Sequence, residues 1–400
     1  MSTSAGVIAL DGGELSLSEG LLALVRPALT RLDEGGVLAI LSRNRDVDHD
    51  LPSWCRAERH EYLGAEDIGN GEHRHLIGRG RFIVQGGDKP AMELRGPMPE
   101  RADPGSGFAP RGVLVEAGGP VYPFDLVDRA HVAPPEVASL YDQAVSSQWD
   151  ATRDVPWTKV GTHAPEIDAA IRQIMTFLAE NELSALYLPS KFISRIHPAY
   201  VEVAMFLATQ LQDEARHIDV FLKRAQLAAG IAVSSVTTSR SLLSLLELQD
   251  FSEAAFLLSV LGEGTFLDLL SFIGRYAPDE ATAELVRRAR NDESRHVHFG
   301  LAHIRHALSQ DASLYPRLEA AVRRRSATLA GVGSVPAPVQ DSLTILAAGG
   351  TDSRSVARGH DAFRELLETM HSSRIKRLLN AGFDAGQAET ISSLHTANFM

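Results

Sequence analysis

The chain has 400 residues, of which 44% are hydrophobic and 22% are charged, a composition typical of a globular protein with room for two or three domains. Its net charge of −12 offers no basic stripe to neutralise phosphates, so we expect no nucleic-acid partner. A single cysteine, Cys55, excludes an intrachain disulfide and a cysteine metal cage, and the N-terminus lacks the features of a signal peptide, so we expect a cytoplasmic protein.

Residues 1–82 alternate between strand-like and helix-like segments. The segments "GVIALDG", "GGVLAILSR", "HEYLGAE" and "HRHLIGRG" predict strands, whereas "SEGLLALVRPALTRLD", with Ser18 as its cap, and "DHDLPSWCRAER" predict helices. The resulting β-α-β-α-β-β order predicts a small two-layer α/β domain. Glycine and proline become frequent over 83–135, which predicts a connecting segment of loops with a β-hairpin or two.

The remainder of the chain, 136–400, has helical periodicity and no strand signals. Helices are predicted near 136–149, 165–188, 199–229, 241–275, 279–308, 315–330, 338–348 and 355–381. We therefore expect a mainly α protein, with a helical-bundle core over 165–310 and further helices over 311–400. The apolar stretch 251–273 contains three acidic residues, so it predicts a buried helix and not a membrane span.

Two similar hexapeptides, "QDEARH" at 212–217 and "NDESRH" at 291–296, stand out in the helical part. Residues three apart share a helix face, so Glu214 lies beside His217 and Glu293 beside His296. Both pairs lie on apolar stripes, where an ionised carboxylate is costly unless it is paired or bound to a metal. The alternative is a pair of incidental buried salt bridges between histidine and glutamate.

Each motif has a matching glutamate upstream. Glu182 precedes Glu214 by 32 residues and Glu263 precedes Glu293 by 30, the separation expected when a helix turns and returns to the same depth. Glu180 competes with Glu182, but only Glu182 falls on the apolar stripe. A di-metal bundle needs such a further glutamate from each of two other helices. Oxygen-rich ligation with one histidine per metal suits iron or manganese better than zinc or copper.

Two other Glu-x-x-His pairs in the chain do not have these accompanying features. Glu72 and His75 lie in a predicted strand, where residues three apart face opposite sides, and Glu368 and His371 have no matching carboxylate upstream. We interpret both pairs as chance. The glycines on either side of Glu263 cost about 1 kcal/mol each relative to alanine inside a helix, which predicts a close approach by a bulky group.

The pattern "ENELSALYLPSKF…QDEARH…GEGTF…NDESRH" resembles the ferritin-like di-iron carboxylate superfamily over about 140–310. It is most similar to the oxygen-activating branch: the monooxygenase hydroxylases, the small subunit of ribonucleotide reductase and the acyl-carrier desaturases. The resemblance implies a ferritin-like four-helix bundle with six iron ligands: Glu182, Glu214, His217, Glu263, Glu293 and His296. It also implies four residues that orient the histidines through a hydrogen-bond network: Asp213, Arg216, Asp292 and Arg295. The alternative is ordinary helix-surface charges, but the symmetric recurrence of the four residues favours the network.

Departures from the superfamily narrow the expected activity. Phe221 stands where reductase subunits have a radical-bearing tyrosine, and Leu267 stands where multicomponent hydroxylases usually have a threonine. Ala289 stands where arylamine N-oxygenases have an extra histidine ligand. Ferritins lack the second histidine and are much shorter. A radical-generating subunit and an iron store therefore both fit poorly.

The first 80 residues resemble the sulfur-carrier fold of the TusA/SirA type, through the order of elements and the stretch "RDVDHDLPSWC". The working cysteine of that family follows the first strand, where this chain has Ser16, and Cys55 matches a non-catalytic position. The resemblance therefore implies a docking module, a substrate-presenting module or a scaffold without persulfide chemistry.

We expect an O2-dependent di-iron monooxygenase or oxidase that hydroxylates, N-oxidises or desaturates a small organic substrate. It would bind two iron ions, or one manganese and one iron, take electrons from a reductase or ferredoxin, form a homodimer and bind no membrane. The alternatives are a metal-binding sensor, storage or interaction protein, and a manganese catalase. Residues one turn from the ligands are expected to line an apolar pocket: Leu178, Leu186, Leu207, Val260 and Leu267.

Overall fold

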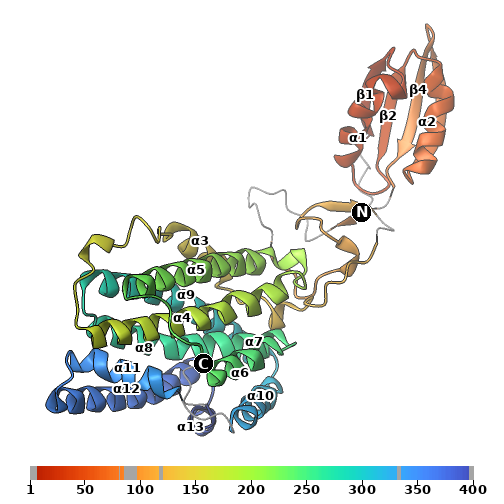
Figure 1. Cartoon of the computed structure of the whole chain (residues 1–400). Coiled ribbons are helices and arrows are strands. Elements are labelled where there is room, and N and C mark those ends of the chain that lie inside the picture. Colours follow the sequence, from red (N-terminus) through yellow and green to blue (C-terminus); the bar gives the residue numbers. More distant parts are fainter. Residues whose placement is uncertain (1–6, 81, 85–96, 117–119, 331–334, 396–400) are drawn as a thin grey trace. The chain divides into compact units, whose positions relative to one another are not determined.

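The computed structural model describes residues 7–80, 82–84, 97–116, 120–330 and 335–395. The chain forms two compact units, both drawn in Figure 1. The first unit comprises Met1–Pro97 and Asp103–Tyr122, and the second comprises Met98–Ala102 and Pro123–Met400. The segment predicted as a connection, 83–135, is thus shared between the two units. Part of it, 85–96 and 117–119, lies outside the described residues.

The first unit is built on a four-stranded sheet with the order β1-β2-β4-β3. Strands β1 and β2 are parallel, and the other neighbouring strands are antiparallel. Leu38 and Ile40 of β2 and Ile77 of β4 are fully buried in one apolar cluster with residues of both helices, so α1 and α2 pack on the same face of the sheet. The elements are β1 (Val7–Gly13), α1 (Leu22–Thr30), β2 (Val37–Ser42), α2 (Asp46–Ala57), β3 (Glu61–Gly69) and β4 (Glu72–Gly78).

This β-α-β-α-β-β order is the one that the sequence predicts, but the start of the first helix differs. A π-helical turn, Leu17–Leu21, precedes α1, and Ser16 caps it by accepting a hydrogen bond of 3.2 Å from the backbone N–H of Glu19. Ser18 was expected in that role and lies inside the turn. A short antiparallel pair, β5 (Phe82–Val84) with β6 (Leu114–Glu116), supplies the hairpin-like pairing expected further on.

The second unit is helical, and its core is a four-helix bundle. Helix α4 packs against α5, and α8 packs against α9, so the bundle consists of two helix pairs that meet where α5 contacts α9 (Figure 1). The mainly α fold class with a four-helix bundle, preceded by a small α/β unit, is confirmed as predicted from the sequence. The bundle helices are α4 (Pro165–Ile193), α5 (Val201–Leu227), the π-helix η6 (Phe256–Glu263) that continues into α8 (Gly264–Arg275), and α9 (Glu280–Gln310).

Within the described residues, seven further α-helices surround this core, and two of them correct the sequence prediction. The helix predicted over 241–275 is interrupted, because Asp250 starts a new helix by accepting a hydrogen bond from the backbone N–H of Glu253. An additional helix near the C-terminus begins with a capping box between Asp384 and Gln387. The surrounding helices are α3 (Val137–Ser146), α6 (Val236–Leu246), α7 (Phe251–Ala255), α10 (Leu314–Leu329), α11 (Ala337–Ala348), α12 (Ser353–Asn380) and α13 (Ala385–Leu394).

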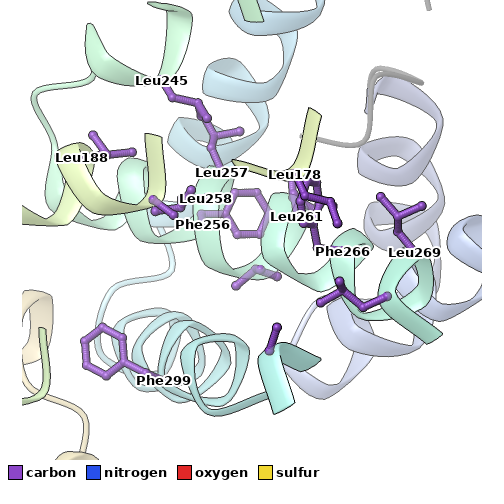
Figure 2. Packing of buried hydrophobic residues seen from close by; sticks show 14 of the residues in the cluster. Leu178, Leu188, Leu245, Phe256, Leu257, Leu258, Leu261, Phe266, Leu269 and Phe299 are labelled. Atoms are coloured by element: carbon purple, nitrogen blue, oxygen red, sulfur yellow. The ribbon is translucent and has the colours of Figure 1, made fainter. Parts of the chain in front are cut away.

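The run Phe251–Arg275 forms the centre of the apolar core. By length and composition it could cross a membrane, but 83% of its apolar stretch is buried inside the protein. Figure 2 shows Phe256, Leu258 and Leu261 of this run packed among side chains of neighbouring helices, including Leu188 of α4. Such burial is expected of the core helix of a bundle.

Replacing Leu261 by alanine should destabilise the protein by about 2–5 kcal/mol, because the side chain is 1% exposed and leaves a cavity. The matched change Leu243→Ala removes a side chain that is 54% exposed, and it should cost no more than about 0.5 kcal/mol. Urea denaturation of both variants, followed by circular dichroism, measures the difference. Equal losses would show that the core is not centred on this helix.

Candidate metal centre

Six acidic and imidazole side chains from four helical segments meet in the middle of the bundle. They form two groups whose ligand atoms lie within 4.8 Å of one another, and Glu214 and Glu293 belong to both groups. The first group adds Glu182 and His217, and the second adds Glu263 and His296. All six side chains are buried. The structure therefore brings together every residue that the sequence singled out as a metal ligand, in two sets of three glutamates and one histidine that could hold two metal ions.

Each imidazole turns its Nδ1 atom toward the two shared carboxylates. His217 Nδ1 lies 3.3 Å from Glu214 Oε2 and 3.2 Å from Glu293 Oε1. His296 Nδ1 lies 3.0 Å from Glu214 Oε1 and 3.4 Å from Glu293 Oε2. The two halves thus repeat the same arrangement about a pseudo-two-fold axis, and each shared carboxylate presents one oxygen to each half.

The inward-facing atoms are the ones left without hydrogen-bond partners. Among the described residues, both carboxylate oxygens of Glu214 and Glu293, one oxygen of Glu182, one of Glu263 and the Nδ1 atoms of both histidines are buried and unbonded. Gathering four buried carboxylates around two imidazoles is costly unless their charge is balanced. Two divalent cations would neutralise the four carboxylates and satisfy these atoms, so the donor set fits a pair of metal ions.

Where no cation is bound, protons must balance the negative charge of the buried glutamates. Burial, reinforced by Glu214 and Glu293, raises the pKa of Glu182 well above its usual value, and burial with the nearby Glu293 does the same for Glu263. Burial alone would lower the pKa of His217, but the surrounding carboxylates outweigh it and raise that pKa well above its usual value. The cluster therefore attracts positive charge strongly, whether as protons or as metal ions.

The outer nitrogen of each imidazole contacts an aspartate from the opposite motif. His217 Nε2 lies 3.2 Å from Asp292 Oδ2, and His296 Nε2 lies 3.3 Å from Asp213 Oδ2. Donation from Nε2–H to the carboxylate leaves the Nδ1 lone pair facing the centre, which is the arrangement in which a histidine binds a metal. The aspartate of α9 thus orients the histidine of α5, and the aspartate of α5 orients that of α9.

Two arginines close this network. Arg216 donates hydrogen bonds to Asp213 and, at 3.0 Å, to Asp292. Arg295 donates to the same two carboxylates at 3.0 and 2.6 Å. The arginine side chains are 5% and 11% exposed, so these four residues are not helix-surface charges. The two arginines and the two aspartates therefore neutralise one another, and the central glutamates take no part in this balance.

Sequence reasoning missed three polar residues at this centre. Gln148 accepts a hydrogen bond of 2.6 Å from Arg216 and donates one of 3.1 Å to Asp213. The indole N–H of Trp149 donates to Asp292 at 2.6 Å, and the ring lies 4.7 Å from the Arg216 guanidinium carbon. Gln210 donates to Glu263 at 2.9 Å. Of the three, only Gln210 could have been recognised from the sequence, because it lies on the same apolar helix stripe as Glu214.

The helix that carries Glu263 is irregular where the carboxylate enters the site. Residues Phe256–Glu263 form a π-helix, a rare conformation that is often found at functional sites. The close approach predicted at the flanking glycines occurs at Gly264, where an added Cβ would lie 2.7 Å from Arg377 Nε of α12. The rival residue Glu180 belongs to neither ligand group.

A scan of the chain against protein-family models finds no match, and a search of curated proteins finds none either. The chain is similar to solved structures of variants of an R2-like ligand-binding oxidase. One, with an aerobically reconstituted Mn/Fe cofactor, has a TM-score of 0.48 and 19% identity, covering 61% of this chain and 93% of that chain. Another, with an Fe/Fe cofactor, has a TM-score of 0.48 and 20% identity, covering 61% and 92%.

The fold and the site together define a four-helix-bundle protein with a buried carboxylate and histidine centre able to hold two metal ions. With so little shared sequence, the interpretation of this centre depends on the geometry of the chain's own side chains. That the six residues bind metal stays a prediction.

Changing Asp213 to Asn should weaken metal binding by about 10–100-fold, because His296 loses its charged acceptor and the arginines lose a counter-charge. Asp219 lies on the same helix but is 51% exposed and pairs with Lys223, so Asp219→Asn should leave the affinity unchanged. Anaerobic titration of both variants with Fe²⁺ and Mn²⁺ against a competing chelator gives the comparison. Equal affinities would remove the proposed orienting role of Asp213.

Proposed function

We propose that the protein is an oxygen-activating oxidoreductase with a di-iron or Mn/Fe centre, acting as a monooxygenase or oxidase on a small organic substrate. The observation that carries the proposal is the pair of overlapping ligand groups with unpartnered inward-facing atoms. Oxygen-rich donors with one imidazole per ion suit iron and manganese. The metal pair would supply the electrons and the oxygen-binding positions for hydroxylation, N-oxidation or desaturation.

The protein's own residues hold and isolate this centre. Glu182 and His217 would hold one ion and Glu263 and His296 the other, while Glu214 and Glu293 belong to both ligand groups. Asp213 and Asp292 fix the imidazole tautomers, which keeps the Nδ1 lone pairs available. Burial of all six side chains excludes bulk water, which protects a reactive oxidant from side reactions.

A small hollow lies beside the centre. It has a volume of about 20 Å³, lies between α4, α5, α7, η6 and α9, and is lined mainly by apolar side chains together with Gln210 and Ser259. Gln210 is bonded to Glu263, so this hollow adjoins the metal centre. Of the five residues predicted to line an apolar pocket, Leu207 lines this hollow and the other four are not among its lining residues. A space of this size holds about one water molecule, so a substrate would have to widen it, and the lining would then favour a small, largely apolar one.

Phe221 bears on the type of oxidation. Its buried ring lies 6.2 Å from that of His217, centroid to centroid. A phenyl ring has no hydroxyl and cannot form the phenoxyl radical that a tyrosine there could carry. The centre is therefore suited to direct substrate oxidation. Each monooxygenase turnover would place one oxygen atom in the product and reduce the other to water, with two electrons from a reductase or ferredoxin and two protons from solvent.

The remaining proposals concern the surroundings of the enzyme. We propose a cytoplasmic homodimer, in line with the acidic composition and single cysteine of the chain.

The first unit has the element order of a sulfur carrier, but Cys55 is fully buried, and burial raises the pKa of its thiol to about 12. A thiol held in this state is a poor nucleophile. We therefore assign the unit a docking or scaffold role without persulfide transfer.

The function is tested by metal analysis and oxygen titration of the purified chain. The proposal expects about two ions of iron, or of iron and manganese, per chain, and rapid O2 uptake by the anaerobically reduced protein. Glu214→Ala removes a ligand shared by both groups and should abolish both properties. Glu368→Ala changes an exposed glutamate of a similar Glu-x-x-His pair and should change neither.

Other outcomes would identify the alternatives. Two bound ions without O2 uptake would favour a metal-binding sensor, storage or interaction protein. Rapid disproportionation of hydrogen peroxide by a manganese-loaded form would favour a catalase. A chain that binds no metal in the bundle would overturn the proposal.

The state of Cys55 gives a separate prediction. Because its pKa is raised above that of an ordinary thiol, the reactive thiolate is scarce at neutral pH. A maleimide at pH 7 should leave Cys55 unmodified in the native protein and modify it fully in concentrated urea, as measured by intact mass. Fast modification of the native protein would reopen the case for sulfur chemistry.

A further inference from the structure

A second cluster of potential metal ligands lies in the first unit, inside the two-layer α/β fold. His73 and His75 are two apart on strand β4, so they point to the same face of the sheet as the buried Ile77. Asp48 lies in the first turn of α2, which packs on this face. A ligand atom from each of the three residues lies within 4.8 Å of the other two.

The distances centre on one carboxylate oxygen. Asp48 Oδ1 lies 2.7 Å from His73 Nδ1 and 3.5 Å from His75 Nε2. Around a tetrahedral zinc ion with ligands about 2.0–2.1 Å away, neighbouring donors lie about 3.3 Å apart. The separation to His75 already matches this value, and the separation to His73 needs to widen by about half an ångström.

His75 provides the observation that a plain hydrogen-bond network does not explain. Its side chain is fully buried, and among the described residues its Nε2 atom has no hydrogen-bond partner. The other nitrogen, Nδ1, lies 3.0 Å from the hydroxyl of Tyr62. When Nδ1–H donates to that hydroxyl, Nε2 presents its lone pair toward Asp48, an arrangement that a cation between them would stabilise.

We propose that Asp48, His73 and His75 form a binding site for a divalent transition-metal ion, best suited to Zn²⁺. Two imidazoles and one carboxylate are a known zinc donor set, and three protein ligands leave a fourth position for water or another ligand. His73 and Asp48 are 16% and 24% exposed, so an ion can enter from solvent. Binding would tie the start of α2 to the centre of the sheet.

The neighbouring side chain of Arg45 opposes binding of the ion, and this gives a test of the proposal. Arg45 Nη1 lies 3.3 Å from His73 Nε2, where its donation favours the tautomer with a proton on Nδ1. Metal binding through Nδ1 requires that proton to leave and the arginine to release Nε2. Arg45 is exposed and can move into solvent at little cost. Removing its side chain should therefore tighten metal binding, an outcome that a structural role for the histidines does not predict.

The experiment counts cobalt and zinc ions bound to the full-length chain and measures the affinity of each by chelator competition. The wild-type protein should bind one ion beyond those held in the bundle, with the visible absorption bands of four- or five-coordinate Co²⁺. His73→Ala and Asp48→Asn should each weaken this ion by about 100-fold or more, since even the loss of an outer partner costs 10–100-fold. Arg45→Ala should strengthen it. The control His49→Ala changes an exposed histidine of the same helix and should have no effect.

A thermal melt separates binding from folding. In the full-length wild-type chain, Zn²⁺ should raise the melting temperature of the first unit. In the His73→Ala variant it should not, and because the His73 side chain is partly exposed, its removal does not open the core. The proposal is overturned if His73→Ala and Asp48→Asn fold normally and still bind as many ions, with the same affinities, as the wild-type chain. It is equally overturned if all bound ions are lost on changing Glu214 alone.

Discussion

The structure of the helical unit depends on the burial of four carboxylates in its centre. Removing a carboxylate from water costs several kcal/mol, and in each ligand group three of them repel one another across less than 5 Å. The bundle can contain them only if positive charge accompanies them. The two inward-facing imidazoles, the raised pKa values of Glu182 and Glu263 and the unpartnered oxygens are all consequences of this requirement.

The hydrogen-bond network of aspartates and arginines around the centre separates two electrostatic tasks, namely orienting the imidazoles and balancing the charge of the glutamates. Asp213, Asp292, Arg216 and Arg295 neutralise one another, so the aspartates can orient the imidazoles without adding net charge to the centre. Because each aspartate contacts the histidine of the other motif, helices α5 and α9 must stay in register for either half to form. A shift of one helix along the other would break both contacts together, which couples the two halves.

Much of this arrangement follows from spacing along the chain. Helical phase selects the six central residues, because a buried Glu-x-x-His pair and an upstream glutamate at the same depth need only local periodicity. Gln148 and Trp149 could not be found in this way, since their partners lie far along the chain and no periodicity links them. The interruption at Asp250 was missed because the residues before it are helix formers and the cap is a single side chain.

The first unit shows a different limit of sequence reasoning. The pair Glu72 and His75 was set aside because it has helical spacing in a strand, and Glu72 is indeed remote from the cluster, paired with Arg43. The relevant spacing in a strand is two, which joins His73 to His75, and the third member of that cluster comes from another element. Side chains that meet through tertiary packing leave no periodic signature.

The π-helix before Glu263 has a consequence for insertions and deletions in this chain. A π-turn accommodates one residue more than an α-helix of the same length, and each residue of an α-helix rotates the next by about 100°. Loss of a single residue between Phe256 and Gly262 would convert the segment to a regular helix. Because Glu263 runs directly into α8, the residues on one side of the deletion would rotate by about 100° relative to those on the other. A one-residue deletion here would therefore disturb the metal centre and the buried apolar core together.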